Sequence, residues 1–352
     1  MNSSHKLAAL FLAAATLYAE ATPPVSLLAL SKTDQTLAIV DPSTNKIIAK
    51  MPSGPNPHEV VASTDGKFAY ISNYGGTESG MIGVIDLVAQ KALPSIDLGA
   101  LHRPHGLMYS GGKLYFTAEE SKVIGSYNPA TNKVDWVLGT GQDRTHMVYV
   151  MPGQKKLITT NISSATMTIV EQTQGGGGRG RGPGGPPPPG GRGPGRGPMG
   201  PQTDWAETVV PVGRGAEGFD VSPDGKEVWA ANAQDGTISI LDLAGEKVIQ
   251  TLEANVMGAN RLKFTPDGKL VLVTTLSGPE LSIIDATTRK TIKRVPTGRG
   301  AAGIQMRPDG EVAYLGCSPD NYVAIVNLKS LEIIGHIDVG GEPDGLAWAV
   351  RQ

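Results

Sequence analysis

The chain has 352 residues, of which 39% are hydrophobic, and it contains 46 glycines and one cysteine. Acidic and basic side chains nearly cancel to a net charge of −2, so the overall charge gives no reason to expect binding to nucleic acid or to an anionic membrane. A single cysteine excludes an intramolecular disulfide. The high glycine content favours many short strands with tight turns over long helices.

The first 21 residues have the pattern of a secretory signal peptide. Lys6 precedes an uncharged run from Leu7 to Leu17, and small-residue cleavage patterns follow at Ala19 and Ala21. The run is too short to cross a bilayer. A buried N-terminal helix is the alternative, but the following Pro23-Pro24 disfavours it. We therefore expect a periplasmic or secreted protein with no membrane span after removal of residues 1–21.

From residue 22 onward the sequence predicts short strands, the first three at 26–30, 36–41 and 46–48. A repeated pattern then sets in: a turn, a strand ending in Asn or a substitute, and a further strand ending in Asp or Asn. Clear copies occupy 68–87, 222–243, 265–285 and 307–327, and three of them open with Pro-Asp-Gly. A repeat of short strands with a period in the low forties is typical of a β-propeller.

One position in each repeat, six residues before the turn proline or its equivalent, defines what we call the column. Its seven members are spaced by 47, 41, 71, 43, 42 and 42 residues, which predicts seven four-stranded antiparallel blades. The column consists of His58, His105, His146, Glu217, Asn260, Ala302 and Asp344. In this alignment the first turn of the repeat of His105 lacks one residue.

The long spacing of 71 contains a segment of Gly, Pro and Arg at residues 174–201. Such a segment has too few apolar side chains to offset its ordering entropy, so we expect a disordered insertion. Strands predicted at 167–170 and 208–212 place it in a loop between the two outer strands of blade 4. The rest, residues 22–352, is predicted to be one propeller domain and a monomer.

The two ends of the chain complement each other. Residues 344–350 read as an innermost strand without its partners, whereas the first three strands lack an innermost strand. Together they make one complete blade, and pairing the ends removes open sheet edges. We therefore predict that the terminal strands close the ring.

The Pro-Asp-Gly turns, the strand Phe68–Asn73 and the strand Gly83–Leu87 resemble the YVTN-repeat (YncE-like) family of seven-bladed β-propellers. The resemblance covers the chain outside the signal peptide and the insertion. It implies the propeller fold and no catalytic residue, because members of this family include binding proteins, surface-layer proteins, a lactonase branch and domains of redox enzymes.

In a propeller, the segments leading into the innermost strand and out of the second strand open on the same face. We therefore expect the column to face a central funnel, beside the ends of the second strands. Ligand-binding candidates at those ends are Asn73, Glu119, Asn161 and Asn232. Three neutral imidazoles, His58, His105 and His146, suit a divalent transition metal such as zinc, copper, nickel or iron. A metal-free ligand pocket and purely structural histidines remain the alternatives.

Arginines near the column are candidates for a rim that attracts anions. They are Arg103, Arg144, Arg214, Arg261 and Arg299. Ordinary solvated loop arginines are the alternative interpretation. No nucleophile-elbow, zincin, paired-cysteine or heme-attachment motif is present.

The leading hypothesis is an exported binding or scaffold protein that holds a small ligand, an ion or a protein partner at the funnel. The second hypothesis is a metal-assisted, lactonase-like hydrolase or lyase that uses the His, Glu and Asp residues of the funnel. A docking module for a periplasmic redox or polymer-handling system is the third. The sequence leaves open whether the protein is an enzyme and which ligand or metal it holds.

Overall fold

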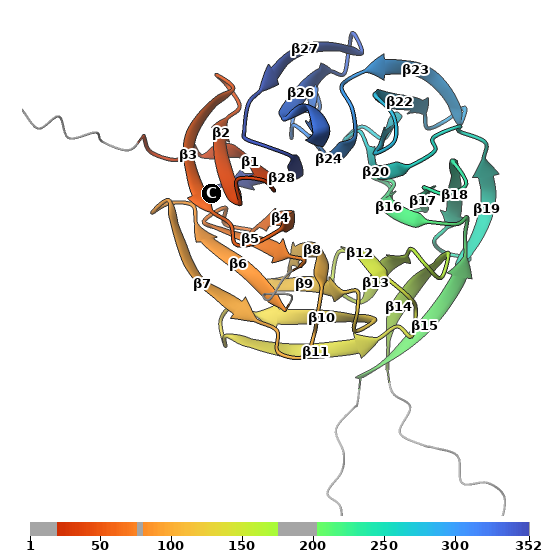
Figure 1. Ribbon diagram of the computed structural model, residues 1–352. Helices are drawn as coiled ribbons and strands as arrows, with labels where there is room; N and C mark the ends of the chain where they lie inside the picture. The colour runs from red at the N-terminus through yellow and green to blue at the C-terminus, as the bar shows by residue number, and fades with distance from the viewer. Residues whose placement is uncertain (1–19, 76–79, 175–202, 352) are drawn as a thin grey trace, which may run out of the picture.

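The computed structural model describes residues 20–75, 80–174 and 203–351, which form a ring of seven four-stranded antiparallel sheets (Figure 1). The all-β, seven-bladed propeller predicted from the sequence is confirmed. The predicted signal peptide and the predicted insertion at 174–201 lie, apart from a residue or two at their edges, outside the described residues. Among the described residues, no helix is long and apolar enough to cross a membrane.

The strands are numbered along the chain, and each blade runs from the innermost to the outermost strand. Blade 1 consists of β28 (Pro343–Val350), β1 (Val25–Ser31), β2 (Thr36–Asp41) and β3 (Lys46–Pro52). Blade 2 has β4 (Pro57–Ala62), β5 (Phe68–Asn73), β6 (Met81–Asp86) and β7 (Lys91–Asp97). Blade 3 has β8 (Pro104–Ser110), β9 (Lys113–Ala118), β10 (Val123–Asn128) and β11 (Lys133–Gly139). Blade 4 has β12 (Thr145–Val150), β13 (Lys156–Asn161), β14 (Thr166–Gln174) and β15 (Thr203–Pro211).

The last three blades follow the same plan. Blade 5 has β16 (Ala216–Val221), β17 (Glu227–Asn232), β18 (Thr237–Asp242) and β19 (Lys247–Leu252). Blade 6 has β20 (Ala259–Phe264), β21 (Leu270–Thr275), β22 (Glu280–Asp285) and β23 (Lys290–Pro296). Blade 7 has β24 (Ala301–Met306), β25 (Val312–Cys317), β26 (Tyr322–Asn327) and β27 (Glu332–Ile337), with a short 3-10 helix, η2 (Ser318–Asp320), after β25.

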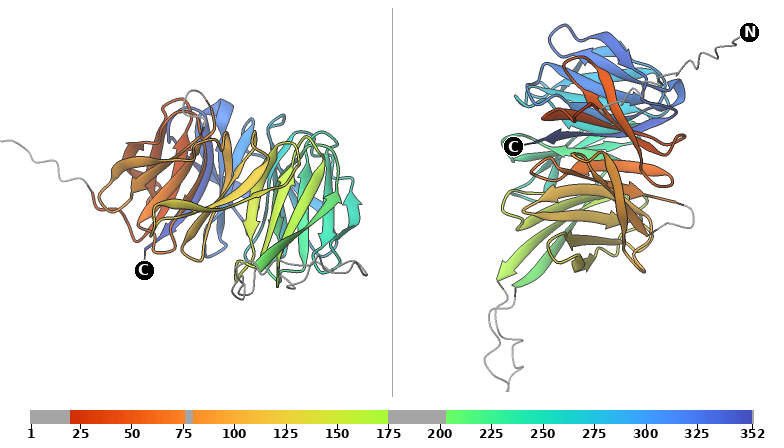
Figure 2. Two further views of the ribbon diagram at one scale, coloured as in Figure 1. Left: turned by 90° about the horizontal axis from the view of Figure 1, so that it is seen from below. Right: turned by 90° about the vertical axis from the view of Figure 1, so that its left-hand side faces the viewer.

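The ring closes in blade 1, where β28 pairs antiparallel with β1. Leu27 lies opposite Trp348 and Leu28 opposite Ala347, so the last strand supplies the inner edge that the first three strands lack. The amide of Arg351 adds a bond to the carbonyl of Pro24 (2.7 Å). The predicted closure is confirmed, because the first and the last strand of the chain lie side by side in one blade (Figures 1 and 2).

The core lies between neighbouring blades. Second strands are buried on both faces, as β5 and β17 show, because each sheet packs against the next. Outermost strands alternate between exposed and half-buried side chains, as in β11. The Pro-Asp-Gly turns behave as expected: Gly225 has a φ of 71°, and Asp224 Oδ1 accepts a bond from the amide of Lys226 (3.1 Å).

Candidate functional site

Every column residue is the second residue of an innermost strand, so the seven side chains start from equivalent places around one axis. The three histidines lie side by side in blades 2, 3 and 4. The ring centroids of His58 and His105 are 5.1 Å apart, and those of His105 and His146 are 3.8 Å apart. The structure thus brings together the three histidines that the sequence aligned.

A backbone irregularity accompanies the column residues. In β4, β8, β12, β16 and β20 the register with the second strand shifts between the first and fourth residues, which is a β-bulge that includes the column position. Bulges re-aim side chains and are frequent beside active sites. Two residues before each column member the chain adopts a left-handed conformation. These residues are Asn56, Arg103, Arg144, Gly215, Gly258, Gly300 and Glu342.

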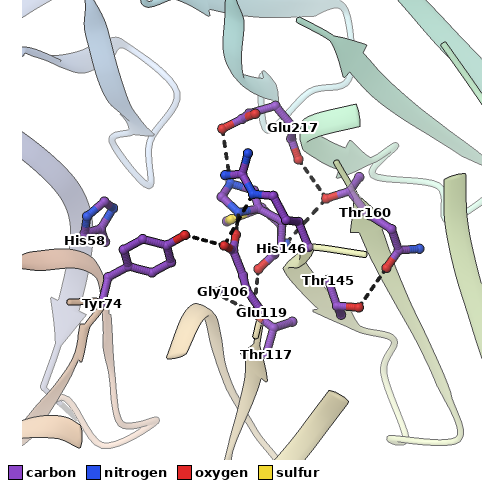
Figure 3. Close-up of polar contacts among 12 residues, drawn as sticks. His58, Tyr74, Gly106, Thr117, Glu119, Thr145, His146, Thr160 and Glu217 are labelled. Atoms are coloured by element: carbon purple, nitrogen blue, oxygen red, sulfur yellow. Dashed lines mark hydrogen bonds and ion pairs between the residues drawn. The ribbon is translucent and has the colours of Figure 1, made fainter. Parts of the chain in front are cut away.

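A hydroxyl group on the second strand satisfies the amide that the bulge frees from the ladder. Thr117 accepts a bond from the amide of Gly106 (2.9 Å) and donates one to the carbonyl of His146 (2.5 Å), which joins blades 3 and 4 (Figure 3). Thr160 likewise donates to the carbonyl of Glu217 (2.7 Å). Bonds from threonine hydroxyls to carbonyls of the next blade therefore hold the backbone at His146 and Glu217 in place.

Glycine follows the column residue in blades 1, 3, 5 and 7, and the sequence analysis did not recognise why. A Cβ on Gly106 would clash with the backbone of His146 and Met147, and a Cβ on Gly345 would clash with the carbonyl of His58. The innermost strands approach each other so closely there that only glycine fits. The signal in the sequence is a glycine directly after the column residue, at Gly106, Gly218, Gly303 and Gly345.

Glu119 is not the equivalent of Asn73, and this corrects the sequence alignment. The turn between β8 and β9 is only two residues long, Gly111-Gly112, both with positive φ, so this hairpin is two residues shorter than in blade 2. Ala118 is therefore the strand end, opposite Pro104, as Asn73 is opposite Pro57. Glu119 is one residue further on and corresponds to Tyr74.

The three asparagines that end second strands serve the blades themselves, which corrects their placement in the funnel. Asn73 Nδ2 donates to the carbonyls of Ser53 and Pro55, both at 3.0 Å. Asn161 bonds to threonine hydroxyls of blade 4, and Asn232 to Thr237 and Ser239 of blade 5. All three are buried, and their amides are engaged in these bonds.

Glu119 instead reaches the column (Figure 3). Its Oε1 pairs with Nδ1 of His146, and its Oε2 accepts a bond from the hydroxyl of Tyr74. Nε of Arg144 lies 3.5 Å from the same Oε2. On the other side of the imidazole, His146 Nε2 lies 3.3 Å from Glu217 Oε1, a distance suited to an ion pair but without hydrogen-bond alignment.

Two carboxylates and three histidines therefore share a buried site with different protonation tendencies. Burial alone would lower the pKa of His146, but the bond to Glu119 and the nearby carboxylate of Glu217 outweigh it and raise that pKa above its ordinary value. Burial and the neighbouring His146 and His58 hold the pKa of His105 well below its ordinary value. Burial also lowers the pKa of His58 to about 4, although Asp344 opposes the shift. His105 and His58 are thus neutral near pH 7 and free to donate a lone pair.

Three of these residues meet the geometric requirement for a metal site. One ligand atom each from His105, Glu119 and His146 lies within 4.8 Å of the others, and all three residues are buried. In the described part of the chain, His105 Nδ1 and His146 Nε2 have no hydrogen-bond partner. Buried polar atoms without partners are rare and call for an explanation. His58, which the sequence grouped with these histidines, is not part of this set.

Blades 1, 2 and 6 contribute ion pairs to the channel. Lys32 Nζ lies 2.5 Å from Asp344 Oδ2, and His58 Nδ1 lies 3.7 Å from the same oxygen. Arg261, one residue after Asn260 in blade 6, reaches across to the carboxylate of Glu59 in blade 2. Arg261 is 8% exposed, so it lies inside the channel and is not a rim residue as the sequence suggested.

The other four candidate rim arginines differ in the residues that their side chains contact. Arg214 and Arg299 are exposed and paired with Asp235 and Asp320, each with an Nε to Oδ1 distance of 2.7 Å. Arg103 lies over the ring of Tyr74, 5.1 Å from its centroid. Arg144 approaches Glu119 as described above. Only the last two therefore stand next to the candidate site.

Arg144 offers a test of the left-handed turn before the column. We expect the free energy of unfolding of Arg144→Gly to stay within about 1 kcal/mol of the parent. Glycine removes the energetic cost of a left-handed conformation, and this gain is similar in size to the contribution of the half-exposed ion pair that is lost. Arg144→Val should cost about 2 kcal/mol, since a β-branched residue is least tolerated at positive φ. Urea unfolding would measure both, and equal stability of the two variants would contradict this account.

Beyond the ionic layer the channel contains a cavity of about 200 Å³. Its walls are largely apolar and come from the innermost strands, with Glu59, Arg261 and Lys263 as the charged members. This volume is below the roughly 300–1,000 Å³ of sites for drug-sized ligands. The described channel therefore suits an ion or a very small molecule.

Comparisons with known proteins agree with the fold. A model of the cytochrome D1 heme domain matches residues 215–343, well under half of the chain. No curated protein matches the sequence.

Solved structures are similar in fold at low identity. A protein from Bacteroides uniformis, provisionally named a 6-phosphogluconolactonase, has a TM-score of 0.71 at 14% identity, with 92% of this chain and 99% of that chain covered. Hydrazine synthase from Kuenenia stuttgartiensis has a TM-score of 0.67 at 17% identity, covering 86% and 92%. The dihydro-heme d1 dehydrogenase NirN has a TM-score of 0.62 at 15% identity, covering 94% and 66%. These similarities place the chain among seven-bladed propellers.

Heme d1 does not fit the channel described here. The residues that match the heme-domain model form blades 5 to 7, whereas the three column histidines lie in blades 2 to 4. The rings of His58, Tyr74, His105 and His146 pack at centroid distances of 3.8–5.3 Å, which leaves no slot for a macrocycle between them. The cavity of about 200 Å³ beyond them is also too small.

Proposed function

We propose that this protein is an exported β-propeller that binds one divalent transition-metal ion in its central channel through His105, His146 and Glu119. The observation that carries the proposal is a set of three buried residues whose ligand atoms lie within 4.8 Å of one another. Within the described residues, two of the three have an imidazole nitrogen without a hydrogen-bond partner. Imidazole nitrogens with one carboxylate suit zinc, nickel, copper or iron.

The surrounding residues suit supporting roles. Tyr74 and Arg144 contact the carboxylate of Glu119, and Glu217 faces His146, so the ligand side chains are held from several sides. Such partners orient the ligands of a metal and tune its affinity. The N-terminal pattern of residues 1–21 supports export, and the repeated turns support membership of the YVTN-repeat family.

Metal binding would be measured on chelator-treated protein by equilibrium dialysis against Zn²⁺, Ni²⁺ and Cu²⁺, with elemental analysis of the bound ion. We expect one ion per chain. His105→Ala and Glu119→Ala should each weaken metal binding by more than the roughly 10- to 100-fold loss that is typical when a residue contacting a metal ligand is removed. His102→Ala is a matched control, because His102 is an exposed histidine outside the channel.

His58→Ala separates the two possible ligand sets. If the ion is held by His105, Glu119 and His146, this variant should keep most of the affinity. Loss of binding in His58→Ala but not in Glu119→Ala would replace the proposed set by the three column histidines. Absence of binding for all three ions would contradict the metal function.

A metal-assisted hydrolase is the second candidate, because a set of three protein ligands leaves a coordination position for water or substrate. Glu217, beside His146 but outside the set, is the candidate for moving a proton. Ester and lactone hydrolysis by metal-loaded protein, compared with Glu217→Gln, tests this. Loading without turnover would leave the binding function in place and remove the enzymatic one.

A further inference from the structure

A second and larger hollow lies between blades 2 and 3, with a volume of about 860 Å³. Three of its sides are the turns that follow β4, β8 and β10, and the fourth is the middle of β7. In an antiparallel blade the turns after the first and third strands share one edge, and the column lies at the opposite edge. The hollow, here called the tyrosine groove, therefore opens on the face opposite the candidate metal site.

Aromatic rings and prolines dominate the tyrosine groove. Tyr70 and Tyr109 are stacked, with centroids 5.6 Å apart and planes at 13°. Within the described residues neither hydroxyl makes a hydrogen bond, and neither is among the buried polar atoms without a partner, so both can donate to a ligand. Tyr127, whose hydroxyl donates to Asn132 Oδ1 (2.6 Å), and Pro94 complete the apolar floor and rim.

This combination matches a known mode of peptide recognition. Proline-rich segments adopt the extended polyproline II helix, which has no internal hydrogen bonds and exposes its carbonyl groups. Grooves lined by aromatic rings bind such segments, with ring faces against prolines and side-chain donors to the carbonyls. The tyrosine groove offers both kinds of contact.

We propose that the tyrosine groove binds the proline-rich part of this chain's own residues 175–202, centred on Pro186–Pro189. That segment connects β14 to β15, the third and fourth strands of blade 4, so it leaves the propeller on the same face as the groove. Blade 4 is next to blade 3, whose corresponding turn, at Pro129 and Asn132, forms one wall of the groove. Topology thus places the occupant at the neighbouring blade.

Chain length and charge also agree. Pro186 is 12 residues beyond Gln174 (186 − 174), and 12 extended residues reach up to about 40 Å. Packed sheets are about 10 Å apart, so a groove one to two blades away is within range. The segment carries four arginines and no acidic residue, at Arg179, Arg181, Arg192 and Arg196. The carboxylate of Asp65, about half exposed, lies on the groove wall, where Lys67 Nζ is 3.4 Å from Oδ2, and it can also receive one of them.

The test uses a synthetic peptide of residues 183–198 and the protein with and without residues 175–202, followed by isothermal titration calorimetry. We expect the peptide to bind the deletion variant, and to bind the whole chain more weakly, because the tethered segment competes at high effective concentration. Tyr109→Ala in the deletion variant should weaken binding at least about tenfold, the loss typical of an aromatic anchor. Tyr109→Phe should lose less, because it keeps the stacked ring.

The same peptide with Pro186–Pro189 replaced by alanine is the ligand control and should not bind. No binding to the deletion variant, or binding that Tyr109→Ala leaves unchanged, would overturn the proposal; melting curves of each variant would show that the propeller is intact. Sedimentation of the whole chain distinguishes the source of the segment. A concentration-dependent dimer that disappears on deletion of residues 175–202 would overturn binding within one molecule.

Discussion

Deletion of residues 345–352 is expected to abolish the cooperatively folded propeller. It removes nearly all of β28, the strand that pairs with β1 from Val25 to Ser31 and closes the ring. The lost side chains include Leu346, Ala347 and Ala349, all buried between blades 1, 2 and 7, and Trp348. The deletion would also expose an edge strand to other chains.

The physical scale supports a complete loss. Burying a single leucine contributes about 1.5–3 kcal/mol, and a whole domain is stable by only about 5–15 kcal/mol. Removing four packed side chains together with the backbone bonds of a full strand costs a free energy of about the same size as the total stability of a domain. Circular dichroism melts and size-exclusion chromatography would show a broad or absent transition and aggregated material.

Deletion of residues 175–202 is the matched control for that experiment. It removes more residues than the terminal deletion, yet it shortens a connection between two strands that already pair along β14 and β15. Loop-closure entropy changes only slowly with loop length, so we expect a melting temperature near that of the parent. Equal damage from the two deletions would contradict the assignment of the blades.

Glu59→Ala is expected to destabilise the propeller by about 3–5 kcal/mol, because it leaves the buried guanidinium of Arg261 without its carboxylate. The pair spans the channel between blades 2 and 6, and Arg261 gives its other bonds to the carbonyl and Oδ1 of Asn260 (3.2 and 3.1 Å). Burial would lower the pKa of Arg261, but Glu59 and, further away, Asp344 and Glu217 raise it. The cation therefore stays charged inside the channel.

A double variant with an apolar pair separates the charge from the packing. Glu59→Leu combined with Arg261→Met should recover most of the lost stability, because an apolar pair of similar volume often replaces a buried ion pair without loss. Glu59→Gln should lie between the parent and Glu59→Ala. Urea unfolding would measure the free energy of unfolding of the parent, Glu59→Ala, Glu59→Gln and the double variant. The comparison requires that the dependence of this free energy on urea concentration has the same slope in all four proteins. A double variant as unstable as Glu59→Ala would contradict a charge-based explanation.

Much of the candidate site could be predicted from single repeats. The column residues were found because each sits at a nearly fixed distance from its own turn, and that distance is set by one hairpin. The same reasoning failed for Glu119, because the two-glycine turn at Gly111-Gly112 shortens the hairpin by two residues instead of one. A pair of glycines between strand patterns is a recognisable signal for such a turn.

Contacts across the axis could not be predicted in this way. Nothing in the sequence connects Glu59 with Arg261, which are 202 positions apart, or separates His58 from the set of His105, Glu119 and His146. Likewise, Asn73 and Glu119 looked alike as polar residues near strand ends, but one is bonded within its blade and the other faces the channel.

The seven blades, the closure of the ring by the two chain ends and the column of histidines could be predicted because strands, turns and repeat spacing are local properties of the chain. Which of these side chains meet depends on how the blades pack against one another. That outcome depends on the bulge in each innermost strand and on glycines that let the strands approach, and both act between blades that are distant in sequence.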